Sequence, residues 1–149
     1  MLPKTHMLLG LVFSGIVWFL FPAIPGWGIL LVFLSSFLID FDHYVVFVLK
    51  QKKMSLNESL KWHDKEDVVQ RKEKAAGIRQ KGHFHLFHTI EFHGIVWLLG
   101  YFLWSGFLYV TIGMIFHSVC DLVYLIQKDY LYRREYLFVN WLRRKLTRN

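Results

Sequence analysis

The chain has 149 residues, 54% of them hydrophobic and 18% aromatic, and its mean hydropathy is +0.32. This composition is too apolar for an ordinary soluble domain of this size, so we expect a single domain that lies in a lipid bilayer. The lone cysteine, Cys120, excludes an intramolecular disulfide and a thiolate-rich zinc site.

The net charge of +7 is compatible with a nucleic-acid-binding protein or with a membrane protein, and the placement of the basic residues distinguishes the two. Ten of the 18 Lys and Arg residues lie between Lys50 and Lys81, and seven more lie between Lys128 and Arg148. No basic residue lies inside an apolar run. This distribution favours a membrane protein, and we expect no nucleic-acid partner.

Four apolar runs follow one another along the chain, each near the about 20 residues that span a bilayer as a helix. They cover residues 6–22, 27–49, 86–104 and 107–127. The first run resembles the hydrophobic region of a signal peptide, but no small-residue cleavage site follows it, so we predict a retained helix. The predicted fold is therefore all-α, a bundle of four transmembrane helices in one membrane domain, residues 1–149.

Charge placement predicts the orientation of these spans. Uncharged turns at residues 21–28 and around Ser105 suit short hairpins on the outer side. The positive-inside rule then places the basic loop 50–82, the basic C-terminal tail and both termini in the cytoplasm, with the chain in the cell membrane. The loop is either a solvated charged segment attracted to anionic lipid headgroups or a short interfacial helix.

Ionisable side chains recur inside or beside the predicted spans, where each one is costly unless it has a partner or a function. Spans one and three begin in the cytoplasm and carry these residues early, whereas spans two and four end there and carry them late. All of them therefore lie at one depth, near the cytoplasmic side. The residues are His6, Asp40, Asp42, His43, His83, His85, His88, Glu91, His93, His117 and Asp121.

The spacing of these residues adds detail. His117 and Asp121 are four residues apart and share a helix face, as Asp40 and His43 do at a spacing of three. Asp42 points elsewhere on an ideal helix, so either the helix loosens around residues 39–43 or Asp42 orients other ligands or holds a second ion.

The third span shows a related pattern. His85, His88 and Glu91 follow at three-residue steps along one face, whereas His83 and His93 fall off it. Imidazole and carboxylate without thiolate suit zinc, iron, manganese or nickel. The number of ligands exceeds what one ion needs, so two or three divalent ions per chain are expected.

These residues resemble the motifs of the membrane-bound metal-dependent hydrolase family called YdjM-like or LexA-regulated. The family pattern runs as an early His, then PDIDH, GHRGxTHS and SHxxxD. Here the elements are His6, then Leu38-Ile39-Asp40-Phe41-Asp42-His43, then Gly82-His83-Phe84-His85-Leu86-Phe87-His88-Thr89, then Phe116-His117-Ser118-Val119-Cys120-Asp121. Ile39 replaces the family's proline, Phe84-His85 replaces Arg-Gly, Phe87 replaces threonine, and Glu91 and His93 are additional.

The family is distantly similar to zinc-dependent phospholipase C and nuclease P1, which act on phosphoesters through metal-activated water. The resemblance implies a hydrolase of a phospholipid or lipid-linked phosphoester at the cytoplasmic membrane face, with zinc as the expected ion and manganese or iron as alternatives. Asp42 or Glu91 would act as the general base. The expected metal ligands are His6, Asp40, Asp42, His43, His83, His88, His117 and Asp121, with His85 and His93 as additional candidates.

Three other functions fit part of the pattern. A divalent-metal transporter or sensor could use the same ligands, but a transport path needs polar groups through the full depth, and the outer halves of the spans have none. A haem held by His88 and His117 is disfavoured by the many carboxylates. The last alternative is an adaptor in which these polar residues serve only stability.

Overall fold

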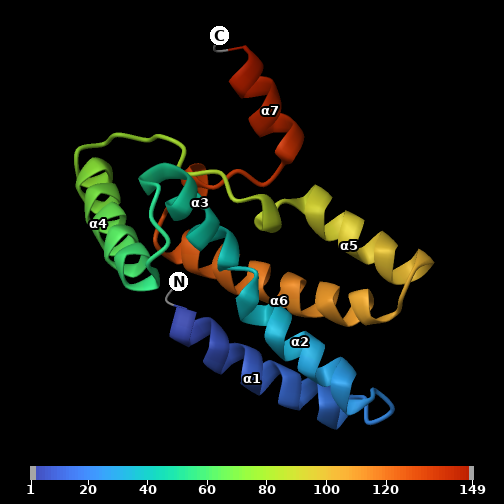
Figure 1. Ribbon diagram of the computed structural model, residues 1–149. Helices are drawn as coiled ribbons and strands as arrows, with labels where there is room; N and C mark the ends of the chain where they lie inside the picture. The colour runs from blue at the N-terminus through green and yellow to red at the C-terminus, as the bar shows by residue number, and fades with distance from the viewer. Residues whose placement is uncertain (1–2, 148–149) are drawn as a thin grey trace.

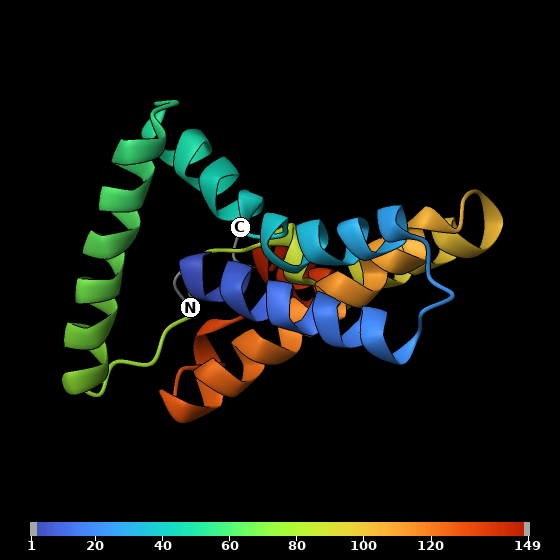
Figure 2. The same ribbon diagram turned by 90° about the horizontal axis from the view of Figure 1, so that it is seen from below.

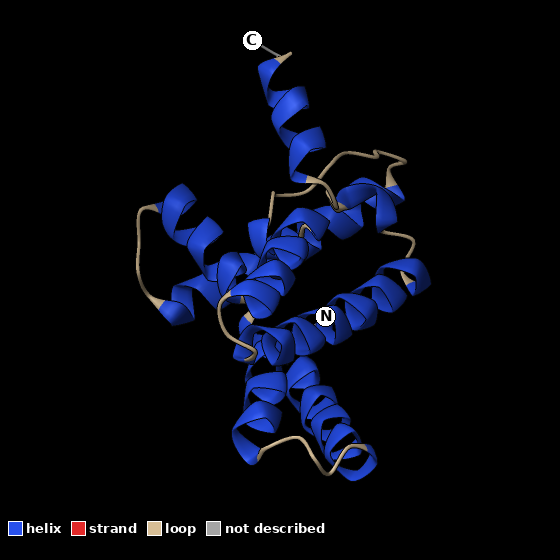
Figure 3. Cartoon of the chain, turned by 90° about the vertical axis from the view of Figure 1, so that its right-hand side faces the viewer, coloured by secondary structure: helices blue, strands red, loops and turns tan. Residues whose placement is uncertain are grey.

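The computed structural model describes residues 3–147, and within them the chain forms helices and loops with no strand, which confirms the all-α class (Figure 1, Figure 3). Arg148, the last basic residue of the predicted tail, lies outside this range, as do both chain ends. The elements in order are α1 (Pro3–Leu20), α2 (Gly26–Leu38), α3 (Phe41–Gln51), α4 (Leu56–Ala75), the short 3₁₀ helix η1 (Leu86–His88), α5 (Ile90–Phe102), α6 (Gly106–Gln127), the 3₁₀ helix η2 (Leu131–Arg133) and α7 (Phe138–Leu146).

The predicted spans correspond to helices of unequal length. Two stretches, Gly26–Gln51 and Gly106–Gln127, are long and apolar enough to cross a membrane. The helices at Lys4–Leu20 and Ile90–Phe102 are apolar but shorter. The third predicted span began at residue 86, but α5 starts only at Ile90, because Thr89 is its N-cap and the Thr89 hydroxyl accepts a hydrogen bond from the Phe92 N–H.

Four apolar helices pack into the body of the molecule. α2 packs along α6, α1 packs against α2, and α5 packs against the other side of α6 (Figures 1 and 2). Tight connections at residues 21–25 and 103–105 join α1 to α2 and α5 to α6, as the uncharged turns predicted. The central pair, α2 and α6, therefore positions everything else.

Small residues allow α2 and α6 to approach closely. A Cβ atom on Gly113 of α6 would lie 2.1 Å from Ser35 Oγ and 2.3 Å from the carbonyl oxygen of Val32 on α2. At the next residue of α2, a Cβ atom on Gly10 of α1 would lie 1.9 Å from Ser36 Oγ. Such small-residue contacts bring helix backbones together where packing rather than the hydrophobic effect drives association.

The stretch Gly26–Gln51 is interrupted at its centre. α2 ends at Leu38, Ile39 and Asp40 form a turn, and α3 begins at Phe41. This interruption confirms the loosened helix, one of the two alternatives for Asp42. It lets Asp40 and Asp42 both face the interior, which two positions two residues apart cannot do on a regular helix.

Two polar helices lie outside the body. Residues 56–75 of the basic loop form α4, whose N-cap Ser55 accepts a hydrogen bond from the Glu58 N–H, so most of the loop is helical. Figure 2 shows α4 standing away from the four apolar helices. α7 projects upward from the body in Figure 1 and carries Arg143, Arg144 and Lys145 in its last turn.

The close contact of α2 and α6 leads to a stability prediction. Gly113→Ala should lower the free energy of unfolding by about 1–3 kcal/mol, because the added methyl group overlaps Ser35 and the Val32 carbonyl and forces the helices apart. Gly94→Ala on α5 is the matched control, since its Cβ meets no atom within 4 Å. It should be neutral or stabilising by up to about 1 kcal/mol. Thermal unfolding in detergent, followed by circular dichroism, tests the pair, and equal effects of both variants would contradict the contact.

Candidate metal centre

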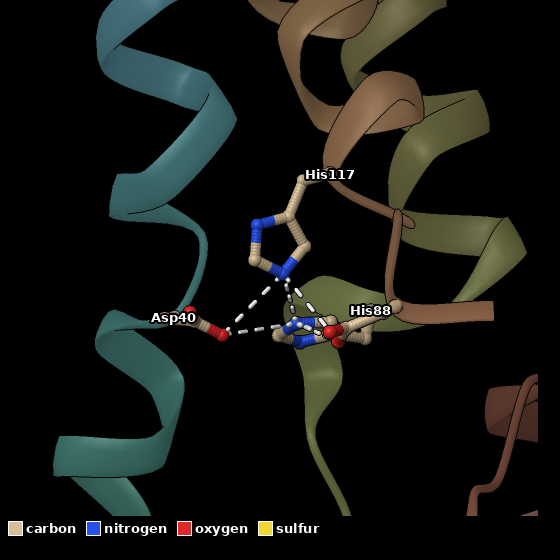
Figure 4. A group of neighbouring side chains, drawn as sticks. Asp40, His88 and His117 are labelled. Atoms are coloured by element: carbon tan, nitrogen blue, oxygen red, sulfur yellow. Dashed lines mark hydrogen bonds and ion pairs between the residues drawn. The ribbon is translucent and has the colours of Figure 1, made fainter. Parts of the chain in front are cut away.

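The interruption after α2, the 3₁₀ helix η1 and the middle of α6 bring a buried polar group together. One ligand atom each from Asp40, His88, His117 and Asp121 lies within 4.8 Å of the other three. Figure 4 shows Asp40, His88 and His117 pointing toward one another from three different elements. His117 and Asp121 share one face of α6, as their spacing predicted.

The distances within this group match the edges of a metal coordination shell. The Nε2 atoms of His88 and His117 are 3.2 Å apart, and Asp40 Oδ1 lies 3.5 Å and 3.4 Å from them, respectively. Asp121 Oδ2 lies 3.5 Å from His117 Nε2 and 3.9 Å from His88 Nε2. Tetrahedral zinc with ligands at 2.0–2.1 Å requires ligand atoms about 3.3 Å apart. The side chains therefore fit a tetrahedral divalent ion with little movement.

A hydrogen bond determines the tautomer of His117. Its Nδ1 lies 2.8 Å from the carbonyl oxygen of Ser36 on α2. A carbonyl can only accept, so Nδ1 carries the hydrogen and donates it. In the neutral ring Nε2 then has a lone pair directed toward the polar group, the orientation in which histidine binds metals.

His88 is oriented in the same way by a carboxylate. Its Nδ1 lies 2.9 Å from Asp42 Oδ2, which also accepts a hydrogen bond from the Phe87 N–H at 3.2 Å. A hydrogen on Nδ1 leaves the lone pair of His88 on Nε2. The arrangement is that of a carboxylate–histidine–metal triad, in which the carboxylate fixes the ring and raises its basicity.

The orientation of the two rings affects the charge balance of this buried group. When both rings are neutral, His88 and His117 direct lone pairs at each other across 3.2 Å, and the carboxylates of Asp40 and Asp121 add negative charge to the same buried volume. Such a group is strongly unfavourable in a low-dielectric interior unless a proton or a metal ion lies among its atoms. The residues therefore fit a bound divalent metal ion.

A second group adjoins the first through His88. Ligand atoms of Asp42, His43 and His88 lie within 4.8 Å of one another, and the ring of His85 stacks on that of His43 with centroids 3.8 Å apart. Asp42 Oδ1 and His85 Nδ1 are buried and 3.5 Å apart, and neither makes a hydrogen bond within residues 3–147. Burial lowers the pKa of His85 although Asp42 opposes this shift, so the ring is neutral and available as a ligand at neutral pH.

Asp121 is positioned by residues distant in sequence. His6 Nε2 on α1 lies 3.0 Å from Asp121 Oδ1, and the His6 ring stacks on His117 with centroids 4.0 Å apart. Arg134 Nη2 lies 2.7 Å from Asp121 Oδ2. His6, a predicted ligand, therefore lies behind Asp121 and stands outside both groups of mutually close ligand atoms among the described residues.

His83, a predicted metal ligand, has other partners in the structure. Its Nδ1 lies 2.8 Å from Lys50 Nζ, its Nε2 lies 3.2 Å from Glu66 Oε2 on α4, and its ring stacks on Trp62. Burial, followed by the charge of Lys50, lowers the pKa of His83. His83 belongs to neither ligand group among the described residues and instead connects the segment after α4 to Glu66 and Trp62 of that helix.

Glu91 and His93 also have other partners. Both carboxylate oxygens of Glu91 accept hydrogen bonds from the backbone N–H groups of Phe138 and Val139, so Glu91 caps the N-terminus of α7. His93 Nε2 donates to the carbonyl oxygen of Phe87 at 3.0 Å. Of the two carboxylates expected to act as general base, only Asp42 lies in the metal-binding groups.

Sequence reasoning missed Ser36 and Arg134. Ser36 acts through its backbone carbonyl, and the signal available was two consecutive serines in an apolar run, which indicates close helix packing. Arg134 lies in a basic tail where each charge looks alike, so no local pattern separates it from its neighbours.

Comparison of the chain with models of known protein families, with curated proteins and with solved structures gives no match.

The carboxylate behind His88 leads to a prediction on metal affinity. Asp42→Asn should weaken zinc binding about 10- to 100-fold, because the amide carries no charge to hold the His88 tautomer and raise its basicity. Glu66→Gln is the matched control, since Glu66 faces His83, which is not in either ligand group. Competition of the purified protein with a chromophoric chelator measures both affinities. Unchanged affinity in Asp42→Asn would exclude the proposed orientation.

Proposed function

We propose that this chain is an integral-membrane, metal-dependent hydrolase that cleaves a phosphoester of a phospholipid or lipid-linked substrate at the cytoplasmic face of the membrane. The observation that carries the proposal is the pair of facing Nε2 atoms of His88 and His117, each freed by a hydrogen bond on its Nδ1. The resemblance of the four sequence motifs to the YdjM-like hydrolases supports the same reaction class.

Zinc is the ion that we propose for the group of Asp40, His88, His117 and Asp121, because the donor atoms are nitrogen and oxygen at tetrahedral spacing. The group of Asp42, His43 and His88 adjoins it. Because the first ion takes the Nε2 lone pair of His88 and its Nδ1 carries a hydrogen, a second ion would be held by Asp42, His43 and the neighbouring His85. A bound zinc ion supplies a Lewis acid for the phosphoryl oxygen and lowers the pKa of water to about 7.

The protein's own residues then supply positioning and proton transfer. Hydrolysis forms a P–O bond from water and breaks the P–O bond to the leaving oxygen. Asp42 Oδ1, which makes no hydrogen bond within residues 3–147, is the carboxylate oxygen that we propose takes the proton from water and returns it to the leaving oxygen. Asp42 Oδ2 meanwhile keeps His88 oriented.

The exposed surface of the apolar helices supports four membrane spans, α1, α2 with α3, α5 and α6. Large apolar side chains lie exposed along them, among them Phe19 at 84% and Phe102 at 72%, whereas soluble proteins limit such surface. The break between α2 and α3 is compatible with a bilayer because it is buried in protein and lines the polar group. The charges of α4 and of the tail favour the cytoplasm for both.

Metal content gives the first test. The protein purified in detergent should contain one or two zinc, manganese or iron ions per chain by elemental analysis, and the double variant His117→Ala, Asp121→Ala should contain none. His63→Ala is the control, because His63 donates to the His43 carbonyl and stands outside both ligand groups of the described residues. No metal in any sample, even after reloading with these ions, would contradict the proposal.

Turnover gives the second test. Metal-loaded protein in vesicles should release product from a phospholipid phosphoester, and Asp40→Ala should lower this rate at least about 10²-fold, because loss of a ligand displaces the ion. His63→Ala should keep the rate. Stoichiometric metal with no hydrolysis of any phosphoester, together with metal uptake into the vesicles, would instead favour a transporter.

A further inference from the structure

A cavity opens beside the metal centre, between α5, α6 and the segment that connects η2 to α7. Its volume is ≈ 220 Å³. His88 forms part of its wall, so the cavity reaches one of the ligands described above. Pockets that enclose a whole drug-sized ligand measure about 300–1,000 Å³. This cavity therefore suits a single small headgroup rather than an entire lipid.

Three of the residues that line the cavity carry hydrogen-bond donors. One of them is Arg134, whose Nη2 lies 2.7 Å from Asp121 Oδ2. The hydroxyl oxygens of Ser118 and Tyr136 are buried and make no hydrogen bond within residues 3–147. Buried polar atoms without a partner are uncommon and call for an explanation, of which a missing ligand is one.

Ser118 is unusual among the hydroxyl residues of these helices. Ser14 and Thr111 each donate to the backbone carbonyl four residues earlier, at 2.8 Å, which is the usual solution for a hydroxyl inside a helix. Ser118 makes no such bond and lines the cavity instead. Its hydroxyl therefore has no hydrogen-bond partner within residues 3–147, beside a cavity that a ligand could fill.

The segment that carries Arg134 is firmly attached. The backbone carbonyl oxygens of Arg133, Arg134 and Tyr136 accept hydrogen bonds from Gly82 N, Lys81 Nζ and Ile90 N, at 2.8, 2.9 and 3.0 Å. We name residues 133–136 the C-terminal strap. Because the strap is anchored on both sides of Arg134, the guanidinium group is positioned at the cavity rather than on a free tail.

The cavity is also lined by apolar residues that are exposed on the outside of the helices. Ile115, Val119 and Leu122 lie on one face of α6 and are 51%, 52% and 39% exposed, and Ile90 opposite them is 62% exposed. In a bilayer this face meets acyl chains. The lining of the cavity thus combines a cationic residue and hydroxyl groups with apolar surface that suits a lipid tail.

We propose that this cavity binds the phosphate headgroup of a lipid, with Arg134, Ser118 and Tyr136 donating to the phosphate oxygens and the apolar tail lying along Ile115 and Val119. The inference rests on the proposed function and names the residues that select its substrate. Arginine matches phosphate with two parallel N–H donors, and the hydroxyl groups complete the set. The guanidinium group of Arg134 would then contact both the Asp121 carboxylate and the phosphate.

Calorimetric titration of the metal-loaded protein in a maltoside detergent, which contains no phosphate, tests this assignment. The probe is dodecylphosphonate, whose C–P bond resists hydrolysis. Arg134→Gln should weaken its binding about 10-fold or more, because a charged hydrogen-bond donor is lost. Tyr136→Phe should weaken binding by a smaller factor. Arg143→Gln on α7, which removes the same charge from an exposed position, should leave the affinity unchanged.

Two further probes identify the source of the phosphate. Methylphosphonate carries the headgroup alone and dodecanol the tail alone, and each should bind at least about 10-fold more weakly than dodecylphosphonate if the cavity takes a lipid. Methylphosphonate binding as tightly as dodecylphosphonate would overturn the lipid assignment. Equal losses in Arg134→Gln and Arg143→Gln would overturn the specific role of Arg134.

Metal content separates this inference from the proposed function. Arg134→Gln should retain its metal, and loss of metal with unchanged phosphonate affinity would show that Arg134 only positions Asp121, which overturns the inference. Specific phosphonate binding by a protein that hydrolyses no phosphoester would keep the headgroup site and reject the hydrolase.

Discussion

The structure depends on one electrostatic constraint: the Nε2 atoms of two histidines face each other across 3.2 Å, together with two carboxylates, in the interior of a helical bundle. Each ring is oriented from its Nδ1 side, His88 by Asp42 and His117 by the Ser36 carbonyl. Because these atoms share a low-dielectric interior, the group needs positive charge among or beside its members. Arg134 supplies part of this charge at Asp121 Oδ2, and a proton or a metal ion between the two rings supplies the rest.

The small residues of α2 and α6 serve the same constraint. Gly113 lies one turn before His117 on α6, and its lack of a side chain lets the α2 backbone come close enough for the Ser36 carbonyl to reach His117 Nδ1. Gly10 on α1 lies against the Ser36 side chain. Packing and ligand orientation are thus two aspects of one contact, and a change in helix separation alters the ring that binds the ion.

The sequence predicted the helical class and the convergence of polar residues. The His and Asp residues lie toward one end of each apolar run, and this placement does not depend on how the helices pack. The sequence also posed two alternatives for Asp42, and the structure combines them, because the helix is interrupted at Ile39 and Asp40, and Asp42 orients His88. It could not separate ligands from neighbours: His83 lies on Trp62, and Glu91 caps α7. These outcomes depend on where α4 and α7 pack in the folded protein. Contacts between residues far apart in the chain produce no periodic pattern in the sequence, so they could not be predicted.

The C-terminal strap has a consequence for how the molecule is assembled during synthesis. Every residue of the two ligand groups belongs to the first 121 residues, whereas Arg134 and Tyr136 follow them in the chain. During synthesis the candidate metal ligands are therefore made before Arg134 and Tyr136, which form part of the cavity wall. Because the strap is attached to residues 81, 82 and 90, its arrival also joins a later-made segment to residues made earlier, and this contact completes the wall of the cavity.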